Sequence, residues 1–197
     1  QMDRLADQRK AFCSQSIEQV KVGILRLLGL TELNDQWQAI ETRHEMQRDV
    51  EEYRYQLNCE GQYPVPVIVR IPSVATKQSN VCIHLTDAGK ASLLLETDRR
   101  DEVSDGTIHV YATNTLLKGR KIVVQADGMN AVVVMHAAVL DERLAAAKLT
   151  RTLKTWRSYI QQPLQHDMMP NVIPGVLCCY DIPDLLVLAQ GSVIIED

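Results

Sequence analysis

The stretch that most restricts the fold is residues 131–160, AVVVMHAAVLDERLAAAKLTRTLKTWRSYI. Its first six residues are rich in valine, which favours a β-strand. From residue 138 onward the apolar residues return every three or four positions, which is the spacing of one helix face. The sequence therefore predicts a strand at 131–136 that leads into a long amphipathic helix at 138–160. We expect this helix to pack on a sheet through Leu149, Leu153, Trp156 and Ile160.

Between residues 67 and 126 the hydrophobic period is two and β-branched residues dominate, which is typical of strands. Turn sequences such as TDAG (86–89) and SDG (104–106) separate the segments. Because these links are too short for a helix, they favour antiparallel pairing over a parallel, doubly wound sheet. The predicted strands cover 67–71, 81–85, 92–96, 107–112, 121–126 and 131–136. Further short strands are expected around 176–180, 185–189 and 192–195, with a helix at 183–190 as the alternative.

The N-terminal part has the spacing of helices. Ile17, Val20 and Ile24 lie on one face of a helix predicted over 3–28, which Gly29 ends. A second helical run is predicted from there to about residue 58. Its apolar stripe changes phase along the run, which favours a bend or two packing partners over one long coiled-coil seam.

The segment CEGQYPVPV (59–67) interrupts this helical pattern, because each proline favours extended backbone in the residue before it. We therefore predict a helical arm at 1–60 and a mainly antiparallel β domain at 61–197. The predicted fold class is α+β. It consists of an N-terminal helical hairpin or coiled-coil arm, followed by an antiparallel β-sheet or small barrel packed against one long amphipathic helix.

Several strands followed by a helix that carries Trp156 are loosely similar to the pleckstrin-homology-like layout. A strand hairpin that leads into such a helix is also similar to the acidic secretion chaperones of the type III class. Neither similarity rests on a specific motif, and the second would need a helix where TIHVYA (107–112) has the pattern of a strand. Neither similarity therefore assigns the sequence to a family.

Composition narrows the classes of partner. Of the 197 residues, 46% are hydrophobic and 23% are charged, which is ordinary for a globular chain. The net charge is −4 and no stripe of Lys and Arg stands out, so nucleic-acid binding is disfavoured. No apolar run approaches the roughly 18 residues of a membrane span. Five cysteines, an odd number at low density, indicate reduced thiols in an intracellular, cytoplasm-like compartment.

Short signatures of known chemistry are absent from the sequence. It has no GxxxxGK[ST], GxGxxG, GxSxG or HExxH motif and no CxxC pair. Cys178 and Cys179 are adjacent, and neighbouring residues of a strand point to opposite faces, so we expect both to pack as small apolar groups. We predict no catalytic residue, no metal site and no cofactor.

The histidines and one acidic segment provide the enzymatic alternative. His84 and His109 lie in predicted strands, and His136 lies at the end of a third. Adjacent strands could bring two of them together as an acid–base pair, with the charged segment 96–106 nearby. This would be a small hydrolase-type enzyme. The alternative for each histidine is an ordinary exposed position on a sheet, and the arginines within 96–106 oppose a cation site there.

The main prediction is a non-catalytic protein–protein interaction module, a structural or adaptor subunit that binds a protein partner or itself. Its basis is the helical arm, which has few ways to bury its apolar stripes alone, and whose aromatic residues are typical interface anchors. An alternative is a secretion-chaperone-like or carrier protein that binds an extended peptide at a sheet edge. The predicted partner-binding residues are Leu33, Trp37, Ile40, Val50, Tyr53 and Leu57.

Overall fold

A computed structural model shows two compact units, and the chain passes between them more than once. Unit 1 contains residues 1–33, 127–142 and 147–197. Unit 2 contains residues 34–126 and 143–146. The structure describes residues 2–30, 37–58, 63–76, 78–85, 108–111, 121–161 and 171–196.

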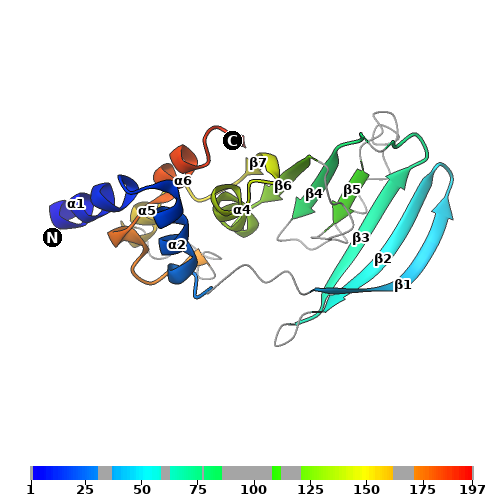
Figure 1. Cartoon of the computed structure of the whole chain (residues 1–197), viewed down its shortest axis with the longest axis horizontal. Coiled ribbons are helices and arrows are strands. Elements are labelled where there is room, and N and C mark those ends of the chain that lie inside the picture. The colour runs from blue at the N-terminus through cyan, green and yellow to red at the C-terminus, as the bar shows by residue number, and fades with distance from the viewer. Residues whose placement is uncertain are drawn as a thin grey trace. The chain divides into compact units, whose positions relative to one another are not determined.

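Unit 2 is built on strands in the order β1-β2-β3-β5-β4-β6 (Figure 1). The pairs β1–β2, β2–β3 and β3–β5 are antiparallel. Strand β4 pairs in parallel with both β5 and β6. Val67, Val69, Val81 and Val124 are buried in its core. The strands are β1 (Gln38–Gln47), β2 (Val50–Asn58), β3 (Val65–Pro72), β4 (Val81–Leu85), β5 (Ile108–Tyr111) and β6 (Ile122–Asp127).

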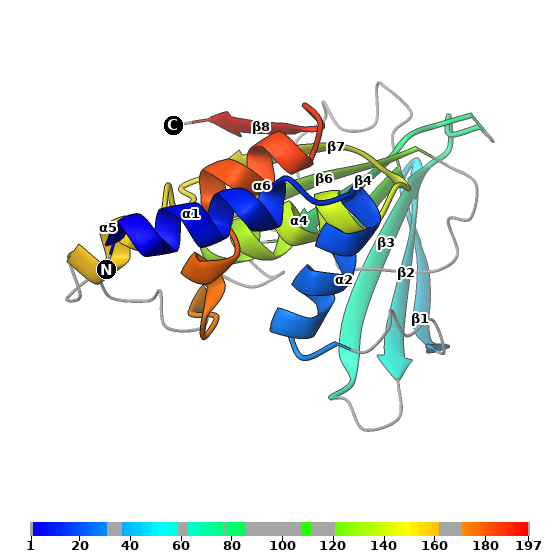
Figure 2. The same ribbon diagram turned by 60° about the vertical axis from the view of Figure 1, so that its left-hand side comes forward.

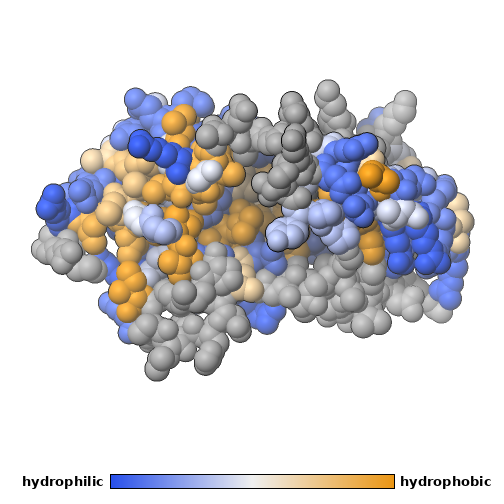
Figure 3. Space-filling model, turned by 90° about the horizontal axis from the view of Figure 1, so that it is seen from below, coloured by the Kyte–Doolittle hydropathy of each residue, from blue (hydrophilic) through white to orange (hydrophobic). Residues whose placement is uncertain are grey.

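The second predicted helix is wrong, because residues 38–58 form the β1–β2 hairpin. Its turn joins Gln47 to Val50, and the rings of His44 and Tyr53 stack across the pair with centroids 4.2 Å apart. β2 also pairs along its length with β3, and such ladder pairing outweighs local helical preference. β1 is exposed along most of its length, and Figure 3 shows hydrophilic side chains gathered over these strands. The N-terminal helical arm is therefore not present as predicted.

The parallel pairs correct the predicted antiparallel sheet. Val81 lies opposite Ile108 on one side of β4 and opposite Ile122 on the other, and both pairings are parallel. Parallel neighbours need crossover connections, which the turn sequences between the predicted strands did not indicate. The predicted strand at 92–96 lies outside the described residues.

Unit 1 consists mainly of helices, with β7 and β8 paired in parallel so that Ala147 lies opposite Val193. Ser16 begins the second helix with a capping box to Gln19, which divides the predicted 3–28 helix into two. α4 contacts α2 and α6 (Figure 2). Within the described part of the chain, no helix has the length and apolar character needed to cross a membrane. The elements are α1 (Met2–Cys13), α2 (Ile17–Leu27), α4 (Met129–Leu140), β7 (Leu144–Thr150), α5 (Trp156–Gln161), η3 (Val176–Cys178), α6 (Ile182–Leu188) and β8 (Val193–Glu196).

The order of elements predicted for 131–160 is also wrong. The valine run forms α4, the stretch predicted to begin the long helix contains β7, and only the short α5 follows. An apolar run that is buried on most sides cannot be distinguished from a strand by its period. Three of the four residues predicted to pack on the sheet are buried: Leu149, Leu153 and Trp156. They belong to a strand, a loop and a helix, respectively, instead of to one helix. The fourth, Ile160, is 66% exposed.

Glu52 is the buried charge that ties the hairpin to the rest of unit 2. Its side chain accepts hydrogen bonds from Arg54 Nε at 2.9 Å and from Arg70 Nε at 3.0 Å. Burial opposes the ionisation of Glu52, but the hydrogen bonds from Arg70 and Arg54 outweigh burial and lower its pKa. Arg70 lies directly opposite Glu52 on β3, so the ion pair fixes the register of β2 against β3.

We expect Glu52→Ala to lower the free energy of unfolding by about 1–3 kcal/mol at neutral pH, because two guanidinium groups lose their acceptor. A carboxylate with a lowered pKa contributes stability that is present above the unfolded pKa, near 4.5, and is lost as the pH falls through the folded one. The difference between wild type and variant, measured by urea denaturation, should therefore shrink below that pH. Glu51→Ala, on the same strand but half-buried, is the control. Equal losses in both variants would contradict the role of Glu52.

Candidate active site

Gly128 forms the turn that leads from β6 directly into α4. This residue has φ 62° and ψ −127°, and the helix begins at the next residue, Met129. Glycine adopts this backbone conformation readily, whereas other residues are strained in it. The chain therefore changes from strand to helix within one residue, and residue 128 lies at the N-terminus of a 12-residue helix.

The end of β7 holds one side of this turn. Gly128 donates its N–H to the carbonyl oxygen of Thr150 at 3.1 Å. The Asp127 carboxylate accepts hydrogen bonds from Thr150 Oγ1 at 2.9 Å and from Arg151 Nε at 2.7 Å, and it also pairs with the Arg151 terminal nitrogen. The hydrogen bond from Arg151 lowers the pKa of Asp127. Asp127 is thus held as an anion by partners that fix the turn.

Asn171 contacts the turn from the side of α4. Asn171 is buried and donates a side-chain hydrogen bond to the carbonyl oxygen of Met129 at 3.2 Å. The indole N–H of Trp156 donates in turn to the carbonyl oxygen of Asn171 at 2.9 Å. Through these two bonds the first turn of α4 is tied to α5, so the turn at Gly128 is fixed from both directions.

His136 is buried in the middle of α4 and has both ring nitrogens engaged. Its Nδ1 lies 2.8 Å from the carbonyl oxygen of Val132, which can only accept, so this nitrogen carries the proton. Its Nε2 lies 3.1 Å from the Tyr180 hydroxyl, which is therefore the donor. Burial lowers the pKa of His136 and raises that of Tyr180. This histidine packs the core of unit 1 and is not positioned as a catalytic base.

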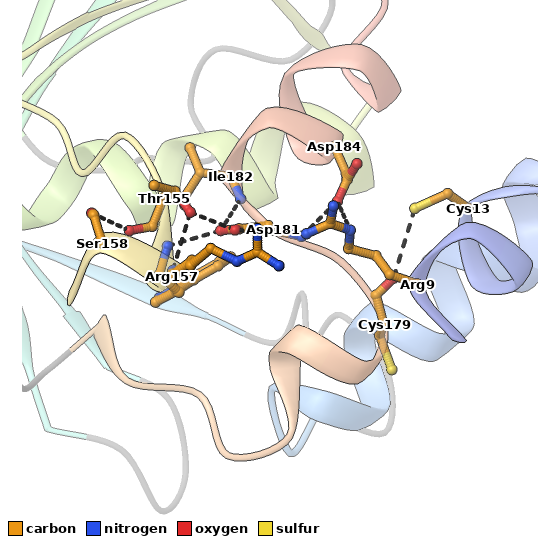
Figure 4. A network of polar contacts seen from close by, with 10 residues as sticks. Arg9, Cys13, Thr155, Arg157, Ser158, Cys179, Asp181, Ile182 and Asp184 are labelled. Atoms are coloured by element: carbon orange, nitrogen blue, oxygen red, sulfur yellow. Dashed lines mark hydrogen bonds and ion pairs between the residues drawn. The ribbon is translucent and has the colours of Figure 1, made fainter. Parts of the chain in front are cut away.

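A second polar network surrounds Asp181, at the start of α6 (Figure 4). The buried carboxylate accepts hydrogen bonds from Thr155 Oγ1 at 2.5 Å and from the backbone N–H groups of Trp156 and Ile182 at 2.8 Å each. Arg9 of α1 lies 3.2 Å from Asp184 through its Nε. Asp181 therefore caps two helices while Arg9 joins α1 to them, and the network is a structural brace for α5 and α6.

Known structures identify the fold. No family model matches the sequence, and neither does any curated protein. A protein from Bacteroides fragilis that has been proposed to be an acetyl xylan esterase is similar over 92% of this chain and 67% of its own, at a TM-score of 0.73 and 11% identity. A glucuronoyl esterase from Solibacter usitatus matches over 89% of this chain and 73% of its own, at 0.63 and 9%. Acetyl xylan esterase 1 from a Thermoanaerobacterium species matches over 92% and 77%, at 0.56 and 10%.

The chain has the α/β-hydrolase fold of these esterases. This finding corrects three predictions: the α+β fold class, the non-catalytic structural or adaptor module, and the statement that the chain is no enzyme. The module prediction rested on a helix that continues to about residue 58, whereas residues 38–47 and 50–58 are strands.

In α/β-hydrolases the strained turn between a strand and a helix carries the nucleophilic serine, within a G-x-S-x-G sequence. A turn of the same form, from a strand directly into a helix, is ADGMN in this chain, residues 126–130, with Gly128 at its centre. The turn is present and the serine is not. We call residues 126–130 the elbow.

The predicted partner-binding residues do not share a helix face. Leu33 lies outside the described residues, and Trp37 precedes β1. Ile40 is 42% exposed on β1, whereas Leu57 of β2 is buried in the core. Val50 and Tyr53 are half-buried on β2. Their role in binding a partner stays a prediction, as do the compartment and the absence of nucleic-acid binding.

The histidines do not form the predicted pair. On β4 and β5, the residue opposite His109 is Cys82, and His84 lies beyond the paired segment. His136 belongs to α4 in unit 1. The acidic segment 96–106 lies outside the described residues. Among the residues that are described, no three His, Cys, Asp or Glu side chains gather as a metal site would require.

The elbow does not stand out in the sequence because the serine of the G-x-S-x-G motif is absent from it. One signal was available: Gly128 lies two residues after the strand predicted at 121–126 and shortly before an apolar run. That arrangement fits a strand–turn–helix as well as a turn between the strands predicted at 121–126 and 131–136. Because the valine run at 131–136 was predicted as a strand, no helix was expected after Gly128, and a turn from strand to helix could not be inferred.

The buried histidine gives unit 1 a pH dependence. A lowered pKa means that the unfolded chain takes up a proton near the ordinary value of 6.5 while the folded chain stays neutral. Stability from this group is therefore complete above that pH and is lost as the pH falls below it. We expect His136→Gln to be less stable than wild type at neutral pH and to lose less stability on acidification to about pH 5. Parallel curves of the free energy of unfolding against pH would contradict this.

Proposed function

We propose that this chain hydrolyses carboxylic esters, and that the carbonyl carbon under attack lies beside Gly128. The observation that carries the proposal is the elbow, which joins β6 to the N-terminus of α4 in a fold shared with esterases. Acetyl xylan esterase and glucuronoyl esterase activities, which the neighbours' names state, are both hydrolyses of carboxylic esters. We propose for this chain the hydrolysis of a carboxylic ester, and we propose no sugar substrate.

The electrostatics of the elbow support this reaction. Attack on an ester carbonyl moves negative charge onto the carbonyl oxygen. The N-terminal end of a helix carries partial positive charge, and fixed dipoles aimed at developing charge lower the barrier. The hydrogen bonds from Gly128 to Thr150 and from Asn171 to Met129 hold the first turn of α4 in place, so little reorganisation is needed. Binding and oxyanion stabilisation alone supply on the order of 10³-fold acceleration over water in hydrolases that lack a member of the catalytic triad.

The test is the hydrolysis of p-nitrophenyl acetate by the purified chain. We expect turnover above buffer, and we expect Gly128→Leu to lower kcat/KM at least about tenfold because its side chain would occupy the elbow. Gly191→Leu is the matched control. Gly191 also has positive φ, 81°, and belongs to the turn between α6 and β8 of the same unit, where a Cβ meets no atom within 4 Å.

Both variants should unfold cooperatively, so that a loss of activity is not a loss of fold. No hydrolysis above buffer by the wild type would contradict the proposed function. Equal losses in the two leucine variants would place the reaction away from the elbow.

A further inference from the structure

The feature that separates this site from the serine esterases is the missing side chain of residue 128. A serine at this turn attacks the ester and becomes the acyl-enzyme. Gly128 carries only a hydrogen at that position. We infer that the chain hydrolyses its ester in a single displacement by water, with no covalent acyl-enzyme; this inference rests on the proposed ester hydrolysis.

The other residues of the elbow offer no unpaired nucleophile. The Asp127 carboxylate accepts a hydrogen bond from Thr150 Oγ1 on one oxygen and pairs with Arg151 through both. The Thr150 hydroxyl is directed to that carboxylate. Ala126, Met129 and Asn130 contribute a methyl group, a thioether and an amide, none of which forms an acyl intermediate. Asp127 is thus the one nucleophilic group of the elbow, and its pairing with Arg151 opposes its attack.

The thiols of unit 1 that are half-buried are also poor candidates. Burial raises the pKa of both Cys13 and Cys179, and the thiolate is the nucleophilic form of cysteine. Cys13 Sγ lies 3.7 Å from the carbonyl oxygen of Cys179, and Figure 4 shows it directed there. Both residues lie beside the Asp181 network, on α1 and directly after η3, and neither belongs to the elbow.

The single displacement balances without any change to the protein. The oxygen of water bonds to the carbonyl carbon, and the bond between that carbon and the alcohol oxygen breaks. The water proton passes to solvent, and the leaving alkoxide takes up a proton from solvent. The acid and the alcohol therefore appear together. A serine esterase with slow deacylation instead releases the alcohol first, as a burst equal to the enzyme concentration.

The experiment mixes the full chain with excess p-nitrophenyl acetate, follows nitrophenol by stopped flow, and measures the intact mass after acid quenching. For the wild type we expect a linear time course and an unmodified mass. Gly128→Cys should give a burst of about one equivalent and an acetyl group on residue 128, because a thiol at a helix N-terminus is partly ionised and attacks an ester without a neighbouring base. Gly128→Ala is the matched control, since it carries the same backbone constraint without a thiol and should give neither signal.

The outcomes separate this inference from the proposed function. A burst or an acetyl adduct on the wild type, on Cys178 or any other residue, would overturn the single displacement and leave ester hydrolysis standing. A Gly128→Cys protein that stays unmodified while the wild type turns over would place the reacting carbonyl away from residue 128 and also overturn the inference. Absence of turnover in the wild type would contradict the proposed function itself, whatever the cysteine variant shows.

Discussion

The backbone conformation of Gly128 is the constraint on which the candidate site depends. With φ 62° and ψ −127°, this residue turns the chain from β6 into α4 without an intervening loop. A side chain at this position is strained, so the conformation persists only where the surroundings impose it. Glycine removes that strain. In the serine hydrolases the strained residue keeps its side chain because that side chain is the nucleophile. In this chain the residue at the turn has no side chain.

The polar groups around the elbow are nearly all hydrogen-bonded or ion-paired. These bonds can hold the turn rigid, although no disulfide or metal site is found among the described residues. Asp127 and the Gly128 N–H bind to the end of β7, and Asn171 connects Met129 to Trp156. His136 and Tyr180 satisfy each other in the core. Each bond is worth little alone, but leaving any of these buried groups unpaired would be costly. The site is therefore held by the same contacts that hold unit 1 together.

The sequence predicted part of this fold well. The strands expected at 67–71, 81–85, 107–112 and 121–126 are present, because alternating β-branched residues bounded by turn sequences are a local signal. The β1–β2 hairpin was not predictable in the same way, since its stability comes from pairing with β3, including Glu52 with Arg70. The elbow required knowing that the valine run after Gly128 is a buried helix, and hydrophobic period alone does not decide between a buried strand and a buried helix.

The most direct test of the account is a crystal structure of the chain with a non-hydrolysable phosphonate analogue of an acetate ester. We expect positive φ at Gly128, a helix that starts at Met129, and the phosphonyl group bound non-covalently beside the elbow. A strand at 131–136, or a phosphonate bound away from residues 126–130, would contradict it.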